Sequence, residues 1–144
     1  MLNIGDNWTC ATGVNNGLPQ LIRCRTNLDE IAARKTHRRL LRITWKYATT
    51  DRSGLPSADL NERMATFENA VVGELERDFL AIFVSIWVSN GIKEWSAYVS
   101  DAQRTCDRLN QALESYDPFP VELTVEDDPS WREYKSLLGK LKAD

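Results

Sequence analysis

Residues 79–99 read FLAIFVSIWVSNGIKEWSAYV, and the first ten of these positions are almost continuously apolar. Such a run, rich in Phe, Ile, Val and Trp, is typical of a strand that is buried on both faces. Asn90 and Gly91 follow, and this dipeptide tolerates the positive φ angles of a tight type I′ turn. Because residues 92–99 then alternate in side-chain character, the whole stretch predicts a β-hairpin at the centre of the fold.

Strict alternation along the first strand of this hairpin would place two sets of side chains on opposite faces of a sheet. One set is Phe79, Ala81, Phe83, Ser85 and Trp87, and the other is Leu80, Ile82, Val84, Ile86 and Val88. Because both sets are largely apolar, both faces need a cover. We expect a helix layer on one face, and on the other the N-terminal hairpin, the last helix or a partner.

The flanking sequence predicts further strands from alternating apolar residues and further helices from apolar residues at steps of three and four. Ser57 and Asp128 are suitable helix caps. Ser100 and Gln103 form a capping box for another helix. The predicted strands span 8–12, 21–26, 40–48 and 119–125, and the predicted helices span 57–77, 100–116 and 128–142, the last with Pro129 at its first position.

The order of these elements is typical of an α+β fold. Residues 40–125 read β-α-β-β-α-β, the split β-α-β arrangement of a ferredoxin-like sandwich, with an antiparallel sheet and helices on one face. In that topology we expect strand 79–88 to be central. Residues 1–39 add an N-terminal hairpin and a basic connector, and residues 128–142 add a C-terminal helix. The length of 144 residues suits a single domain spanning 1–144.

Charge is distributed unevenly along the chain, although the formal net charge is only −3. Residues 1–57 carry nine Lys or Arg and four Asp or Glu, whereas residues 58–144 carry nine and seventeen. An asymmetry of this kind can mark a surface that faces a partner. The predicted partner-binding residues are the cations Arg34, Lys35, Arg38, Arg39 and Arg42 and the carboxylates Glu122, Asp127 and Asp128.

No residue pattern predicts catalysis, a cofactor or a metal site. His37 is the only histidine. Because it lies among Arg and Lys residues, we expect a solvated loop residue rather than a general base. The cysteines at 10, 24 and 106 form no CxxC pair, which argues against a disulfide framework and a zinc site. The sequence contains neither a Gly-rich phosphate loop nor a nucleophile elbow.

Several short segments together resemble the bacterial family called domain of unknown function 695. They are Trp8, Gly17-Leu18-Pro19, Asn27-Leu28, Gly54-Leu55-Pro56, Phe67-Glu68-Asn69, Asn90-Gly91, Glu94-Trp95, Tyr98, Asp128-Pro129, Trp131 and Tyr134. Lys93 and Ser96 depart from the pattern, because members of the family often carry an Arg and a further aromatic residue there. The resemblance implies the same fold and a cytosolic bacterial origin, and it supplies no catalytic residues.

Two classes of function remain open. The first is a non-catalytic protein-binding module, specifically an immunity or inhibitor protein that neutralises a bacterial toxin by presenting carboxylates to a basic cleft. The alternative is a regulator of RNA processing or decay that binds RNA or a nuclease through residues 34–42, although the acidic net charge does not favour nucleic acid. Without a signal peptide or a membrane-spanning run, we expect a cytoplasmic protein, either monomeric or homodimeric, that binds no membrane.

Overall fold

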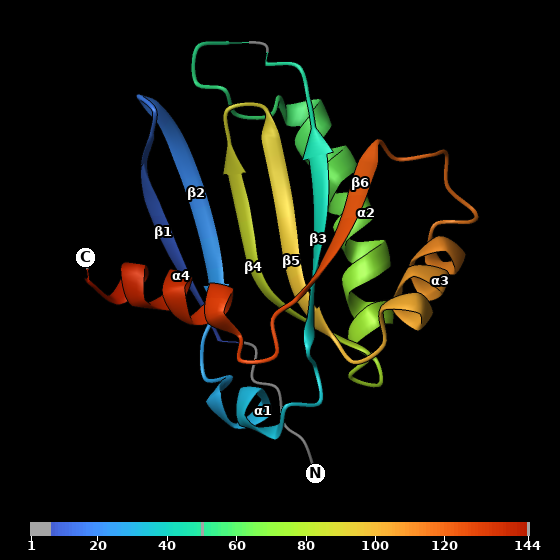
Figure 1. Ribbon diagram of the computed structural model, residues 1–144. Helices are drawn as coiled ribbons and strands as arrows, with labels where there is room; N and C mark the ends of the chain where they lie inside the picture. Colours follow the sequence, from blue (N-terminus) through green and yellow to red (C-terminus); the bar gives the residue numbers. More distant parts are fainter. Residues whose placement is uncertain (1–6, 50, 144) are drawn as a thin grey trace.

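Six antiparallel strands form one sheet in the computed structural model, which describes residues 7–49 and 51–143 (Figure 1). The elements are β1 (Trp8–Asn15), β2 (Leu18–Arg25), α1 (Asp29–Arg34), β3 (Arg39–Lys46), α2 (Ala58–Glu76), β4 (Ala81–Ser89), β5 (Ile92–Val99), α3 (Ala102–Ala112), β6 (Val121–Asp127) and α4 (Arg132–Ala143). The strand order is β1-β2-β4-β5-β3-β6. The α+β class is therefore confirmed.

The strands from β3 to β6 form the ferredoxin-like part of the sheet, in the order β4-β5-β3-β6. The expectation that this topology makes strand 79–88 central is wrong, because in these four strands alone β4 would lie at an edge. It becomes an inner strand because β2 of the N-terminal hairpin pairs with its free side, from Gln20 opposite Ser89 to Cys24 opposite Ser85. The hairpin thus extends the sheet and does not cover one of its faces.

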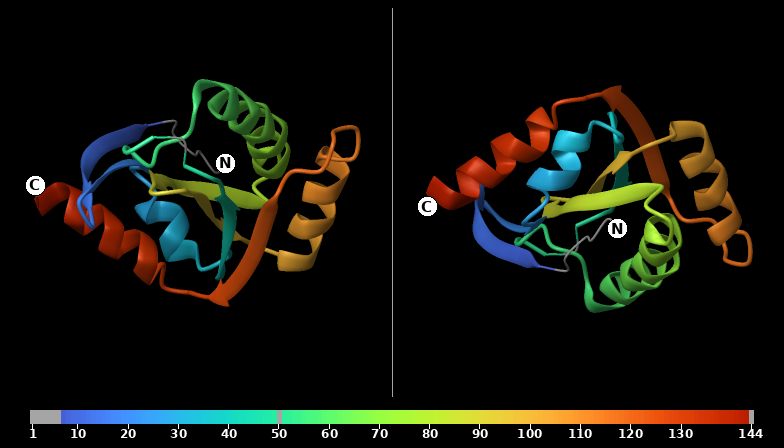
Figure 2. Two further views of the ribbon diagram at one scale, coloured as in Figure 1. Left: turned by 90° about the horizontal axis from the view of Figure 1, so that it is seen from above. Right: turned by 90° about the horizontal axis from the view of Figure 1, so that it is seen from below.

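Two helix layers enclose the sheet (Figure 2). Helices α2 and α3 cover one face, where Trp45, Phe67 and Trp95 belong to the larger apolar core. Helices α1 and α4 cover part of the other face, where Tyr98 and Trp131 stack with ring centroids 4.1 Å apart. The chain itself therefore supplies the second cover that the apolar strand 79–88 requires.

A β-bulge in β4 changes the alternation that the sequence predicts. Phe83 pairs with Ala97, whereas Ser85 pairs with Ser96, so Val84 has no opposite residue on β5. An extra residue of this kind reverses the faces of all positions that follow it. Ile86 therefore belongs to the core beneath α2, although strict alternation placed it on the other face.

The predicted β4–β5 turn is confirmed, because Asn90 and Gly91 have φ angles of 45° and 83°. The cap of α2 is also confirmed, since the Ser57 hydroxyl accepts a hydrogen bond from the Leu60 amide at 3.2 Å. Helix α3 is capped by Asp101 rather than by Ser100. The Ser100 hydroxyl is used elsewhere and donates to the Leu80 carbonyl at 3.3 Å.

Helix α4 begins at Arg132, so the prediction of a helix from Asp128 with Pro129 at its first position is wrong. Residues 128–131 form a turn in which the Trp131 amide donates to the Asp128 carbonyl at 3.1 Å. Trp131 has a φ angle of 59°, which is incompatible with a right-handed helix. Asp128 still caps α4, because its carboxylate accepts hydrogen bonds from the Arg132 and Glu133 amides.

Candidate partner-binding site at the end of the sheet

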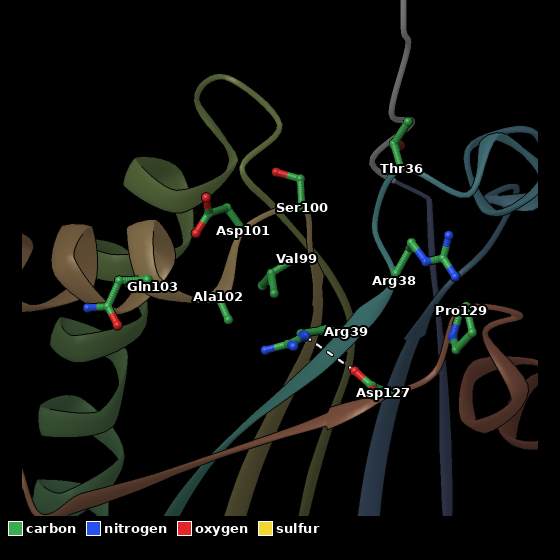
Figure 3. Close-up of a pocket in the computed structure, with 10 residues that line it drawn as sticks. All are labelled: Thr36, Arg38, Arg39, Val99, Ser100, Asp101, Ala102, Gln103, Asp127 and Pro129. Atoms are coloured by element: carbon green, nitrogen blue, oxygen red, sulfur yellow. Dashed lines mark ion pairs between the residues drawn. The ribbon is translucent and has the colours of Figure 1, made fainter.

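A cavity of about 550 Å³ lies where the ends of β3, β5 and β6 meet the first turn of α3 (Figure 3). Its walls come from the connector before β3, the β5–α3 junction and the β6–α4 corner. The lining residues are Thr36, Arg38, Arg39, Val99, Ser100, Asp101, Ala102, Gln103, Asp127 and Pro129. Three segments that are far apart in the sequence therefore build one hollow at the surface.

Local hydrogen bonds hold the α3 wall of this cavity. Asp101 has an extended backbone, and its carboxylate accepts a hydrogen bond from the Arg104 amide at 3.0 Å. The Thr105 hydroxyl donates to the Asp101 carbonyl at 2.7 Å. These contacts cap the helix and fix the direction in which Ser100 leaves β5.

The opposite wall carries two arginines, Arg39 with an ion pair and Arg38 without one among the described residues. Arg39 and Asp127 are paired across β3 and β6, and their side chains form an ion pair of 3.2 Å between Nε and Oδ1. Both side chains are more than half exposed. Arg38 is exposed and has no ion pair with any other described residue. Exposed pairs contribute little to stability, so a partner can exchange these contacts at small cost.

The structure separates the other predicted cations from this cavity. Arg34 pairs with Glu30 within α1 at 3.0 Å, and Lys35 ends that helix with a φ angle of 56°. Arg42 points to the α4 side of the sheet, where its guanidinium contacts three carboxylates. These are Glu94 at 3.5 Å, Glu126, and Glu133 at 3.6 Å.

The predicted carboxylates are separated in the same way. Asp127 lines the cavity, whereas Glu122 lies near the other end of β6 and pairs with Lys46 at 3.7 Å. Asp128 is only 8% exposed. Its carboxylate accepts a hydrogen bond from the Tyr98 hydroxyl at 2.6 Å, in addition to the two α4 amides. Burial raises its pKa, but these hydrogen bonds outweigh burial and leave the pKa of Asp128 below its usual value.

His37 lies beside this site but is only 4% exposed, so the prediction of a solvated loop residue is wrong. Its Nε2 lies 2.5 Å from the Phe79 carbonyl oxygen, and the Thr36 hydroxyl lies 2.9 Å from Nδ1. Burial lowers the pKa of His37, partly offset by the hydrogen bond to Phe79. The indole of Trp131 donates to the His37 carbonyl at 2.8 Å, a contact across 94 residues that no local sequence pattern reveals.

The cavity offers groups for recognition: two guanidinium groups, two carboxylates, two hydroxyls and an amide. The neutral His37 ring is engaged with Phe79 and does not line it. In the described ranges, His, Cys, Asp and Glu side chains nowhere gather in threes at metal-binding distance. Across those ranges no helix is both long and apolar enough to cross a membrane.

Comparison with known proteins adds one finding. The model of the family described as "Family of unknown function (DUF695)" matches residues 6–138. No curated protein matches the sequence. The family match thus covers every strand of the sheet and most of α4.

Proposed function

The chain belongs to the DUF695 family, whose function is unknown, and we propose that it acts as a non-catalytic protein-binding module. The observation that carries this proposal is the mixed charge of the cavity at the end of the sheet. An exposed Arg39–Asp127 ion pair lies next to Arg38, which has no ion pair in the described chain. Groups of both signs on an exposed, concave surface suit a protein partner that brings complementary charges.

The specific proposal is an immunity or inhibitor protein that neutralises a bacterial toxin. Support comes from carboxylates on the α4 side of the sheet, where Glu94, Glu126 and Glu133 surround the guanidinium of Arg42. This cluster has two more negative than positive charges. A surplus of this kind attracts the basic cleft of a nuclease and accelerates its association.

The alternative, a regulator that binds RNA through residues 34–42, has weaker support. Arg34, Arg39 and Arg42 are each paired with carboxylates of the same chain. Those carboxylates would repel phosphate groups at the distances where RNA has to bind. Of the five predicted cations, only Lys35 and Arg38 form no ion pair with another described residue and are left for a nucleic acid.

Co-expression with the product of the neighbouring gene, as the candidate toxin, tests the proposal. We expect protection of growth and a complex that co-elutes in size-exclusion chromatography. Replacing Asp127 with Lys should weaken the complex by about tenfold or more, because a carboxylate at the cavity that attracts the basic cleft becomes a repulsive cation.

Glu122→Lys is the matched control, since Glu122 is also an exposed carboxylate on β6 but lies outside the cavity. We expect this variant to bind like the unaltered chain. Absence of both complex and protection would contradict the inhibitor proposal. An equal loss in the control and in the Asp127 variant would remove the cavity from the interface.

A further inference from the structure

A second cavity, of about 410 Å³, lies between the N-terminal hairpin and the start of α2. It forms because β1 and β2 extend the sheet past the edge of the helix that covers β4 and β5. Its walls are mostly apolar. The lining residues are Cys10, Ala11, Thr12, Leu21, Ile22, Arg23, Leu55, Pro56, Asn61, Ile86, Val88 and Lys93.

The size and lining of this cavity match those of small-molecule sites, which are mostly apolar, measure roughly 300–1,000 Å³ and contain a few polar groups. Ile86 and Val88 are buried on β4, where the bulge turns them toward this side of the sheet. Leu21 on β2 is 43% exposed, which is high for a large aliphatic side chain. An apolar ligand placed here would remove Leu21 from water.

One end of the cavity is cationic. Arg23 and Lys93 line it, and both are near the carboxylate of Glu68, at 3.2 Å and 3.8 Å. The same carboxylate accepts a hydrogen bond from the Trp95 indole at 2.8 Å. Glu68 therefore contacts two cations and one neutral donor, and among the described residues one positive charge here has no carboxylate of its own.

Lys93 is the more enclosed of the two cations in the wall of the cavity. Its side chain is only 12% exposed, and its ammonium lies over the Trp95 ring, 5.0 Å from the centroid. The distance of 3.8 Å to Glu68 exceeds a hydrogen bond, and no other described residue accepts one from Lys93. Burial accordingly lowers the pKa of Lys93. A ligand oxygen in the cavity would accept a charge-assisted hydrogen bond from this ammonium.

We propose that this cavity binds a free aliphatic monocarboxylate. The carboxylate accepts hydrogen bonds from Lys93 and lies near Arg23, while the hydrocarbon chain packs on Leu21, Ile86 and Val88. A single negative charge matches the one positive charge that has no carboxylate of its own among the described residues, and the apolar walls match the chain. This inference is independent of the protein-binding function, because the two cavities share no lining residue.

Isothermal titration with octanoate tests the proposal, with octanol and octylamine as probes that keep the chain and change the head group. We expect octanoate to bind, octanol to bind at least tenfold more weakly, and octylamine not to bind. Lys93→Met keeps the length of the side chain and removes its charge, and it should weaken octanoate binding by about tenfold or more. Lys46→Met on β3 is the matched control and should leave the affinity unchanged.

Alkylation of the cysteines gives a second readout that does not depend on a variant. Cys10 is exposed and lines the cavity, whereas Cys106 lies on α3, outside it. Octanoate should slow the reaction of Cys10 with iodoacetamide and leave that of Cys106 unchanged. Equal binding of octanol and octanoate, or no protection of Cys10 at saturating octanoate, would overturn the proposal. Either result would leave the toxin experiment unaffected.

Discussion

At the scale of single residues, the His37 side chain stabilises a strained stretch of backbone at Phe79. Phe79 has a φ angle of 59°, a left-handed conformation that is unusual for an aromatic residue. The buried imidazole faces the carbonyl of Phe79, at 2.5 Å from Nε2, and therefore donates its Nε2 proton there. The ring thus supports the backbone immediately before the central strand β4.

Stability should depend on the protonation of His37. Burial lowers its pKa in the folded chain below the ordinary value of 6.5, so the unfolded chain binds a proton more readily. The free energy of unfolding should therefore be fully retained above pH 6.5 and fall as the pH drops below it, by at most about 1.4 kcal/mol per pH unit. Urea denaturation at pH 7.5, 6.5 and 5.5 measures this slope.

His37→Gln is the control for this prediction, because its amide can still donate to the Phe79 carbonyl but does not titrate. The slope between pH 7 and 5 should be smaller in the variant, whereas titration of carboxylates should affect both proteins alike below pH 5. If the two proteins lose stability in parallel across this range, His37 is not the group responsible.

At the scale of elements, the β4 bulge decides which helix layer each side chain meets. Val84 has no partner on β5, whereas its neighbours Phe83 and Ser85 pair with consecutive residues of that strand. The bulge places Ile86 under α2 and leaves Trp87 on the other face, where its indole donates to Gln20 at 2.9 Å. It also creates the apolar wall of the cavity beside α2, because Val88 follows the same reversed alternation.

The β4–β5 turn is sensitive to an added methyl group. A Cβ at Gly91 would lie 3.0 Å from the Tyr47 carbonyl oxygen, and the φ angle there is 83°. Gly91→Ala should therefore lower the free energy of unfolding by about 1–3 kcal/mol. Urea denaturation measures the change, and a neutral effect would mean that the loop around Tyr47 moves away freely.

Gly73→Ala is the matched control for this substitution. Gly73 lies within α2, and no atom within 4 Å would meet its added Cβ. The alanine variant should be more stable by about 0.5–1 kcal/mol, because alanine loses less backbone entropy in a helix. The two variants should therefore change stability in opposite directions.

At the scale of the whole molecule, the uneven charge of the sequence becomes internal pairing. Cations in the first part of the chain contact carboxylates in the second part, either between β3 and β6 or between β2 and α2. The pairs are Arg23–Glu68, Arg25–Glu76, Arg39–Asp127, Arg42–Glu126 and Lys46–Glu122. A basic stretch in the sequence thus does not form a continuous basic surface in the fold.

This pairing predicts a weak dependence of any RNA binding on salt. With Lys35 and Arg38 as the available cations, the logarithm of the binding constant should fall by no more than about 1.4 per tenfold rise in salt. Fluorescence anisotropy of a labelled single-stranded RNA between 20 and 200 mM salt, roughly one decade, gives this slope. A slope near −3.5, roughly that of five phosphate contacts, would revive the RNA alternative.

Local patterns in the sequence determined the elements. Three features each depend on residues close in the chain: the apolar run 79–88, the Asn90-Gly91 turn and the row of apolar residues along α2. The structure contains all three. The order of elements was enough to predict the ferredoxin-like part of the sheet. Local periodicity and turn geometry act over a few residues, so they can be read without knowing the fold.

Only the tertiary structure decided the bulge, the burial of His37 and the partners of the charged residues. Arg42 and Glu126 are 84 positions apart, and His37 and Trp131 are 94 apart. The candidate site was predicted in part, since Arg38, Arg39 and Asp127 share one cavity whereas Arg42 and Glu122 lie elsewhere. Contacts between distant segments depend on sheet register and layer packing, and these are properties of the whole chain and not of any one stretch.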